Sequence, residues 1–179
     1  EVEIINAEKL TLDFITNELP QYGVIFFATH GGYINNKHWL LTGSPFVCEV
    51  ETKDKWVADS IEIFYLTFED PKTGQKRRAQ YVGINEDFLS KHSANYPDNS
   101  IMFCTACQSL KGNNNLAKIF QSKNLGCFVG YNEENYQGKQ LGIYFLENLI
   151  VTNATVSEEF LRSKSRFDEV EIFSTNQVK

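Results

Sequence analysis

Two side chains in this sequence have the chemistry of a nucleophile and of the base that would activate it. Cys107 follows the apolar run Ile101–Ala106 and precedes polar residues, so we expect its thiol at the end of a buried strand. His30 follows a second apolar run, Val24–Ala28, and an imidazole can accept a thiol proton near neutral pH. The two residues predict nucleophilic catalysis by a cysteine thiolate.

Two glycines, Gly31 and Gly32, follow His30 directly. Because glycine has no Cβ, it leaves backbone N–H groups open to a ligand. The N–H groups of Gly31 and Cys107 would together bind the oxyanion that forms when a thiolate attacks a carbonyl. A tight turn after the strand explains the same two glycines, so both interpretations stay open at this point.

Cys104, three residues before Cys107, raises alternatives to a nucleophile. A thioredoxin-type redox pair needs a proline later in the chain. All prolines precede the pair: Pro20, Pro45, Pro71 and Pro97. A zinc site needs about four ligands, and the sequence has no second Cys-x-x-Cys and no His-x-x-x-His motif. We therefore expect Cys104 to fill the core, on the opposite face of the strand from Cys107.

The remaining histidines and cysteines compete less well for a functional role. His38 precedes a tryptophan in an expected loop, and His92 lies in a polar segment, so both are expected to be solvated surface residues. Cys48 lies in an expected strand within residues 43–50, and Cys127 lies in another apolar run. A cysteine in such a run behaves as a small hydrophobic residue.

Short apolar runs alternate with amphipathic segments along the chain. Buried strands are expected at Val24–Ala28, Ile101–Ala106 and Cys127–Tyr131. Helices are expected where apolar residues recur at helical spacing: Glu8–Leu19, Asn85–His92, Asn114–Lys123, Tyr136–Leu149 and Thr155–Ser163. This alternation is typical of an α/β domain with a largely parallel central sheet. Ligands gather at the carboxyl ends of such strands, where His30 and Cys107 are both expected.

A β-hairpin is expected between these elements. Ser60–Phe68 and Arg77–Ile84 have strand-like patterns, and Pro71 and Gly74 lie between them. The hairpin falls between the segments that carry His30 and Cys107, so we expect it to shape the rim of the site.

The composition is that of a folded domain. The chain has 179 residues, of which 42% are hydrophobic and 13% aromatic, enough for one domain over residues 1–179 with a substantial core. The net charge of −6, without a basic block, argues against direct contact with nucleic acid. No apolar run reaches the roughly 20 residues that a membrane span needs. The sequence starts at Glu1 without a signal peptide, which leaves an excised domain and a mature form both open.

Two segments resemble motifs of the caspase-like cysteine peptidases. VIFFATHGG (Val24–Gly32) resembles their strand and His-Gly motif, and MFCTACQSLKG (Met102–Gly112) resembles their strand ending in Ala-Cys. The order of elements from about Asn6 to Leu149 is most similar to the CHAT branch, which neighbours separase, gingipain and clostripain. The resemblance implies a caspase-like three-layer sandwich, with a mostly parallel central sheet flanked by helices and an inserted β-hairpin.

The resemblance also implies roles for particular residues. Cys107 would form a thioester with a protein or peptide substrate, His30 would be the base, and the Gly31 and Cys107 N–H groups would bind the oxyanion. In relatives an acid in the loop after the next strand selects a basic residue before the scissile bond. This points to Glu134 first and Glu133 second, although a solvated acidic loop explains the same residues. We expect no cofactor and no metal. Besides the protein or peptide substrate, the expected partner is a regulatory domain or another protein.

Two departures from the family pattern favour an alternative function. The acid-Ser-Gly that usually follows the cysteine is replaced by Gln108-Ser109-Leu110, and the loop after the third strand lacks the usual tryptophan and aspartate. Such changes are expected of a catalytically inactive caspase-like domain that acts as a binding or regulatory module. A peptidase and a binding module therefore both stay open on the sequence.

Overall fold

The computed structural model describes most of the chain, with gaps. The described residues are 3–6, 9–45, 61–69, 72–134, 138–152, 154–156, 158–159, 161–162 and 171–174. The described strands form two four-stranded sheets. The expected strand around Cys48 lies mostly outside the described residues, as does Cys48 itself.

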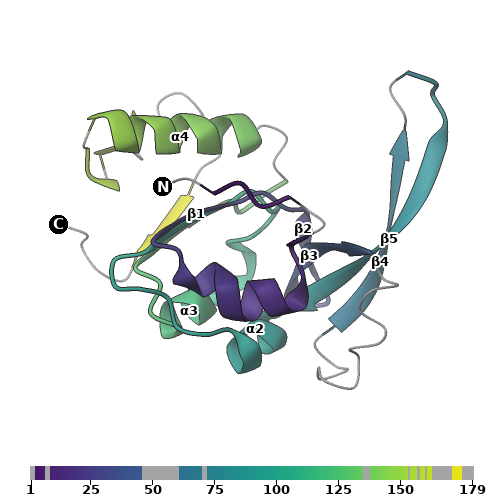
Figure 1. Cartoon of the computed structure of the whole chain (residues 1–179), viewed down its shortest axis with the longest axis horizontal. Helices are drawn as coiled ribbons and strands as arrows, with labels where there is room; N and C mark the ends of the chain where they lie inside the picture. Colours follow the sequence, from purple (N-terminus) through teal and green to yellow (C-terminus); the bar gives the residue numbers. More distant parts are fainter. Residues whose placement is uncertain are drawn as a thin grey trace.

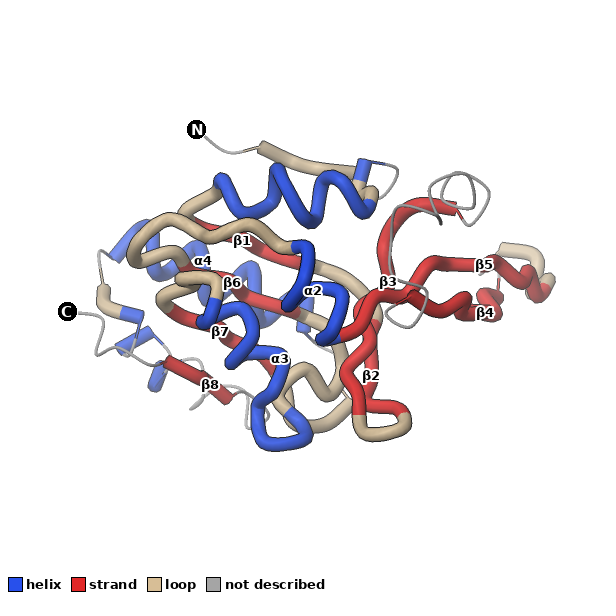
Figure 2. The backbone as a smooth tube through the Cα atoms, turned by 90° about the horizontal axis from the view of Figure 1, so that it is seen from below, coloured by secondary structure: helices blue, strands red, loops and turns tan. Residues whose placement is uncertain are grey.

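The first sheet is the central one, and its strand order is β1-β6-β7-β8 (Figure 2). Its strands are β1 (Val24–Phe27), β6 (Ile101–Cys104), β7 (Cys127–Gly130) and β8 (Glu171–Ser174). The first three strands run parallel, and β8 pairs antiparallel with β7. The expected α/β class with a mostly parallel sheet is confirmed, whereas β8 was not predicted.

Helices cover both faces of this sheet (Figure 1). Helix α4 (Gly138–Thr152) lies on one face. The other face carries an N-terminal helical segment (residues 12–21), α2 (Glu86–His92) and α3 (Lys111–Ser122). The N-terminal segment contains a π-helical stretch, η2 (Phe14–Glu18), and a 3-10 turn, η3 (Leu19–Gln21).

Neighbouring residues of each central strand enter different cores because side chains alternate between the two faces of a sheet. In β6, Phe103 belongs to the core under α4, where its ring meets three others: Phe26, Tyr131 and Phe145. Met102 and Cys104, on either side of it, belong to the core on the opposite face. The central strands are buried on both faces, which explains their nearly continuous apolar sequences.

Irregular turns lie close to two of the helix boundaries that the sequence predicted. The first helical segment continues through Pro20, because a proline in the first turn of the 3-10 helix removes no hydrogen bond that the helix needs. Helix α3 is bounded by Lys111 and Ser122, but Gly112, Asn113 and Asn114 all lie in the left-handed region (φ 60–65°), so its regular right-handed part begins after Asn114, close to the expected start. Glycine and asparagine are the residues that adopt this conformation most easily.

The second sheet is antiparallel and projects from the central body (Figure 1). Its order is β2-β3-β5-β4, formed by β2 (Gly31–Ile34), β3 (Lys37–Pro45), β4 (Ile61–Glu69) and β5 (Lys76–Asn85). The β4–β5 pair confirms the predicted hairpin. The β2–β3 hairpin was not predicted, although its Asn35-Asn36 turn, with φ of 52° and 61°, has the residue type that such two-residue turns favour.

The prediction that His38 is a solvated loop residue is wrong. His38 lies in β3 with 1% of its surface exposed, and its Nδ1 contacts the Glu86 carboxylate at the start of α2. The same carboxylate oxygen accepts the His38 backbone N–H at 3.2 Å. His92 is half-buried against Phe88, and desolvation, with smaller contributions from two lysines, lowers the pKa of its imidazole. Sheet pairing buries His38 beside a carboxylate 48 residues away, which local sequence cannot indicate.

We predict that Phe103→Ala destabilises the protein by about 3–5 kcal/mol, because it empties the centre of the core between the sheet and α4. Urea denaturation followed by far-UV circular dichroism measures the change in the free energy of unfolding. Ile150→Ala is the matched control, because Ile150 lies on α4 and is 72% exposed. A loss below about 1 kcal/mol for Phe103→Ala would show that α4 does not seal this face of the sheet.

Candidate functional site

His30 and Cys107 follow equivalent positions of two adjacent parallel strands. In the β1–β6 register Phe27 pairs with Cys104, and each candidate residue comes three positions later in its own chain segment. Parallel strands end at the same edge of a sheet, so both segments leave the sheet on the same side. The sequence prediction of a shared carboxyl edge is borne out by this pairing.

Hydrogen bonds hold the two segments together beyond the strand ends. The Thr105 N–H donates to the Phe27 carbonyl at 3.0 Å. The Thr105 hydroxyl then accepts the Thr29 N–H at 3.2 Å. The two segments therefore stay in contact as far as Thr29, which precedes His30, and Thr105, which lies two residues before Cys107.

Gly31 packs directly against the residue before Cys107. A Cβ placed at Gly31 would lie 2.9 Å from the Ala106 Cβ and 2.5 Å from the Trp39 carbonyl oxygen. The Trp39 oxygen belongs to the backbone and cannot move aside as a side chain would. Glycine at position 31 is thus what allows β2 to approach Ala106, which provides a structural reason for the His-Gly pair.

The Gly31 N–H points toward the edge of β2 that faces Cys107. The Leu41 N–H donates to the His30 carbonyl at 2.9 Å, so His30 and Leu41 form a hydrogen-bonded pair. In an antiparallel ladder such pairs alternate with non-bonded ones, whose N–H groups point away from the partner strand. Gly31 and, two residues later, Tyr33 both have this orientation, and the Tyr33 N–H donates to Gln108 Oε1 at 3.0 Å.

The loop that follows β7 closes the other side of the Cys107 turn, which we define as Thr105–Leu110. The Gln108 N–H donates to the Glu133 carbonyl at 3.0 Å, and the Leu110 N–H donates to the Tyr131 carbonyl at 2.9 Å. The Ser109 hydroxyl accepts the Tyr131 N–H at 3.0 Å. Glu133 and Glu134 have exposed side chains, and the backbone of Glu133 contacts the turn.

The three described cysteines differ in their access to solvent. Cys104 and Cys127 are fully buried, and desolvation raises the pKa of their thiols to about 12 and about 11. Cys107 is half-buried, His30 is exposed, and none of these cysteines forms a disulfide with another described residue. Because the thiolate is the nucleophile, Cys107 is the described cysteine suited to react.

Gln108 and Ser109 are part of the site, although sequence reasoning treated them only as departures from a family pattern. Gln108 adopts φ 57°, a left-handed conformation uncommon for a residue with a side chain. Its side chain reaches β2 and its N–H reaches the loop after β7. The sequence signal was present, because two polar residues follow an apolar strand at the point where the chain must turn.

Neither a metal centre nor a membrane span is found in the described residues. No three of their His, Cys, Asp and Glu side chains gather in an arrangement that could hold a metal ion. No helix among them combines the length and apolar character needed to cross a bilayer. No protein-family model, characterised protein or solved structure gives a significant match to this chain.

We predict that iodoacetamide modifies Cys107 in the folded protein much faster than it modifies Cys104 or Cys127. Burial protects the latter two thiols and raises their pKa, so few thiolates form at pH 8. Timed alkylation followed by peptide mass mapping measures the three rates, and alkylation in urea supplies the fully accessible reference. Equal rates for Cys104 and Cys107 in the folded protein would contradict this assignment.

We also predict that Gln108→Ala lowers the free energy of unfolding by about 0.5–1.5 kcal/mol, because the Tyr33 N–H loses its acceptor. Gln108→Glu is the matched control, since a carboxylate oxygen can accept the same hydrogen bond. Urea denaturation measures both variants. The interpretation fails if Ala and Glu at this position give the same stability.

Proposed function

We propose that this chain is a cysteine endopeptidase of the caspase-like type, with Cys107 as nucleophile and His30 as its base. One observation carries the proposal: the two residues follow the paired positions Phe27 and Cys104 at the same offset, on the same edge of the sheet. The resemblance of both segments to caspase-like motifs supports the same assignment. The three-layer arrangement around a mostly parallel sheet is compatible with it.

The proposed reaction has two steps. The Cys107 Sγ thiolate attacks the substrate carbonyl carbon, and the N–H groups of Gly31 and Cys107 donate to the resulting oxyanion. The His30 imidazolium gives its proton to the leaving amine as the C–N bond breaks, which leaves a thioester. Water, deprotonated by His30, then attacks the thioester, and the thiolate leaves.

Glu134, with Glu133 as the second choice, is proposed to select a basic residue before the scissile bond. The contact between the Glu133 carbonyl and the Gln108 N–H supports this role, because it holds the acidic loop against the Cys107 turn. A carboxylate near the reacting carbonyl would favour a guanidinium or ammonium group on the acyl side of the substrate.

We predict that a peptidyl chloromethyl ketone ending in arginine forms a single adduct on Cys107. Intact mass and peptide mapping locate the thioether. His30→Ala should abolish labelling because the thiol loses its base, whereas the matched variant His92→Ala, on α2 with its ring against Phe88, should label normally. Replacing arginine by aspartate, asparagine or leucine in the probe tests Glu134, and Glu134→Gln should weaken labelling by the arginine probe alone.

The outcomes separate the functions that the sequence left open. Labelling by the leucine or asparagine probe but not by arginine would retain the peptidase and remove the proposed role of Glu134. If no probe labels Cys107 while iodoacetamide does, the thiol is accessible but not activated. The chain would then be a caspase-like binding or regulatory module rather than a peptidase.

A further inference from the structure

A groove of about 260 Å³ lies beside His30 and outside the contacts described so far. Half-buried or buried apolar side chains line it from four segments: Ile5 and Leu10 before the first helix, Leu41 in β3, Leu66 in β4 and Tyr81 in β5. Among the described residues that line the groove, none is Asp, Glu, Lys or Arg. An apolar group would enter it without leaving a charge unpaired.

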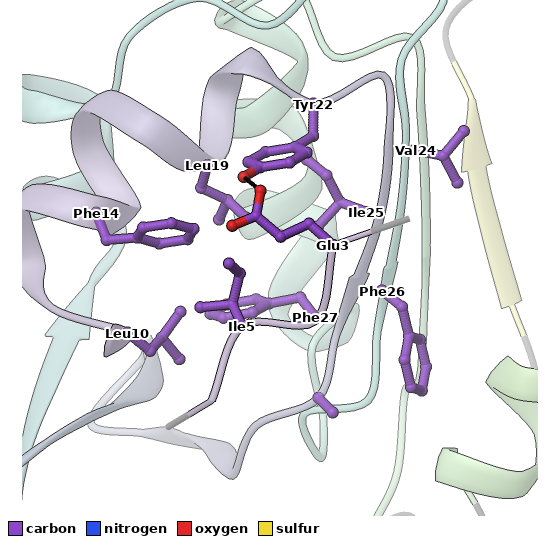
Figure 3. Close-up of a pocket in the computed structure, with 11 residues that line it drawn as sticks. Glu3, Ile5, Leu10, Phe14, Leu19, Tyr22, Val24, Ile25, Phe26 and Phe27 are labelled. Atoms are coloured by element: carbon purple, nitrogen blue, oxygen red, sulfur yellow. Dashed lines mark hydrogen bonds between the residues drawn. The ribbon is translucent and has the colours of Figure 1, made fainter. Parts of the chain in front are cut away.

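The groove continues away from His30 along the N-terminal segment. It shares Ile5, Leu10 and Ala28 with a second hollow of about 160 Å³ between that segment, the first helix and β1. Figure 3 shows Phe14, Phe27, Ile5 and Leu10 around this hollow, with Tyr22 and Glu3 joined by a hydrogen bond at its rim. The Gly43 N–H donates to the Leu10 carbonyl at 3.2 Å and fixes this wall to β3.

The two sides of Cys107 therefore differ in chemistry. Because β6 lies between β1 and β7 in the sheet, the Cys107 turn has His30 and the apolar groove on the β1 side. The loop with Glu133 and Glu134 lies on the β7 side. A substrate peptide that crosses the turn would place its two ends in these different surroundings.

We infer that the groove binds an apolar side chain of the residue that follows the scissile bond, an inference that rests on the proposed peptidase function. The imidazole that protonates the leaving amine must lie beside that amine, so the leaving half of the substrate passes His30. His30 itself lines the groove, which makes the groove continuous with the site on the leaving-group side. Leucine-like side chains match its lining better than glycine or acidic ones.

Aminolysis of the thioester, which is the reverse of acylation, tests the leaving-group side of the site directly. An added amine that binds there attacks the thioester carbonyl: a C–N bond forms, the C–S bond breaks, and the amine proton passes through His30 to the released thiol. We would acylate the protein with a blocked arginine methyl ester, or with the asparagine or leucine ester, and add amino acid amides as nucleophiles. Chromatography measures the ratio of peptide to hydrolysed acid.

We predict that leucine amide gives at least about tenfold more peptide than glycine amide at equal concentration, as burial of one apolar side chain would produce. Leu66→Asp should reduce that preference about tenfold and favour lysine amide, and Leu66→Lys should favour glutamate amide. Thr67→Asp is the matched control: it adds the same charge at the next position of β4, which is exposed and faces the opposite side.

Hydrolysis of the ester without added amine tests the proposed function separately. If the wild-type protein hydrolyses the ester but shows no preference for leucine amide, the groove is not the leaving-group subsite and the peptidase stands. The inference is also overturned if Leu66→Asp, Leu66→Lys and Thr67→Asp all keep the wild-type preference. If none of the three esters acylates Cys107, the proposed function and the inference fail together.

Discussion

The parallel pairing of β1 with β6 is the constraint on which the rest of the structure depends. Parallel strands need a long connection, and here that connection holds the antiparallel sheet and α2. Closing such a loop costs chain entropy, which burial of the strands on both faces offsets. The pairing also fixes the offset between the segments with His30 and Cys107, so the candidate site is a consequence of the sheet register.

Given this pairing, hydrogen bonds to neighbouring segments fix the conformation of the Cys107 turn. Thr105 binds the end of β1, Gln108 binds β2 and the loop after β7, and Ser109 binds Tyr131. These three side chains satisfy backbone groups of segments remote in sequence. Gln108 and Ser109 thus have a structural role that is compatible with either a peptidase or a binding module.

The strand order makes the two sides of the candidate site chemically different. Since β6 is flanked by β1 and β7, the turn separates an acidic loop from an apolar groove. The inserted antiparallel sheet lines the groove through Leu41, Leu66 and Tyr81, and its strand β2 contacts the turn through Gly31 and Tyr33. Under the proposed function the insertion would shape the recognition of ligands, while the central sheet holds the segments with His30 and Cys107 at a common edge.

The sequence by itself determined the buried strands, the main helices, the β4–β5 hairpin and the two residues expected at one sheet edge. These features depend on local periodicity and on the rule that parallel strands share an edge. Only the tertiary structure decided the burial of His38 beside Glu86, the contact between Tyr33 and Gln108, and the pairing of β8. Those features join residues far apart in sequence, such as the 75 positions between Tyr33 and Gln108, and depend on strand register and packing, which local patterns do not encode.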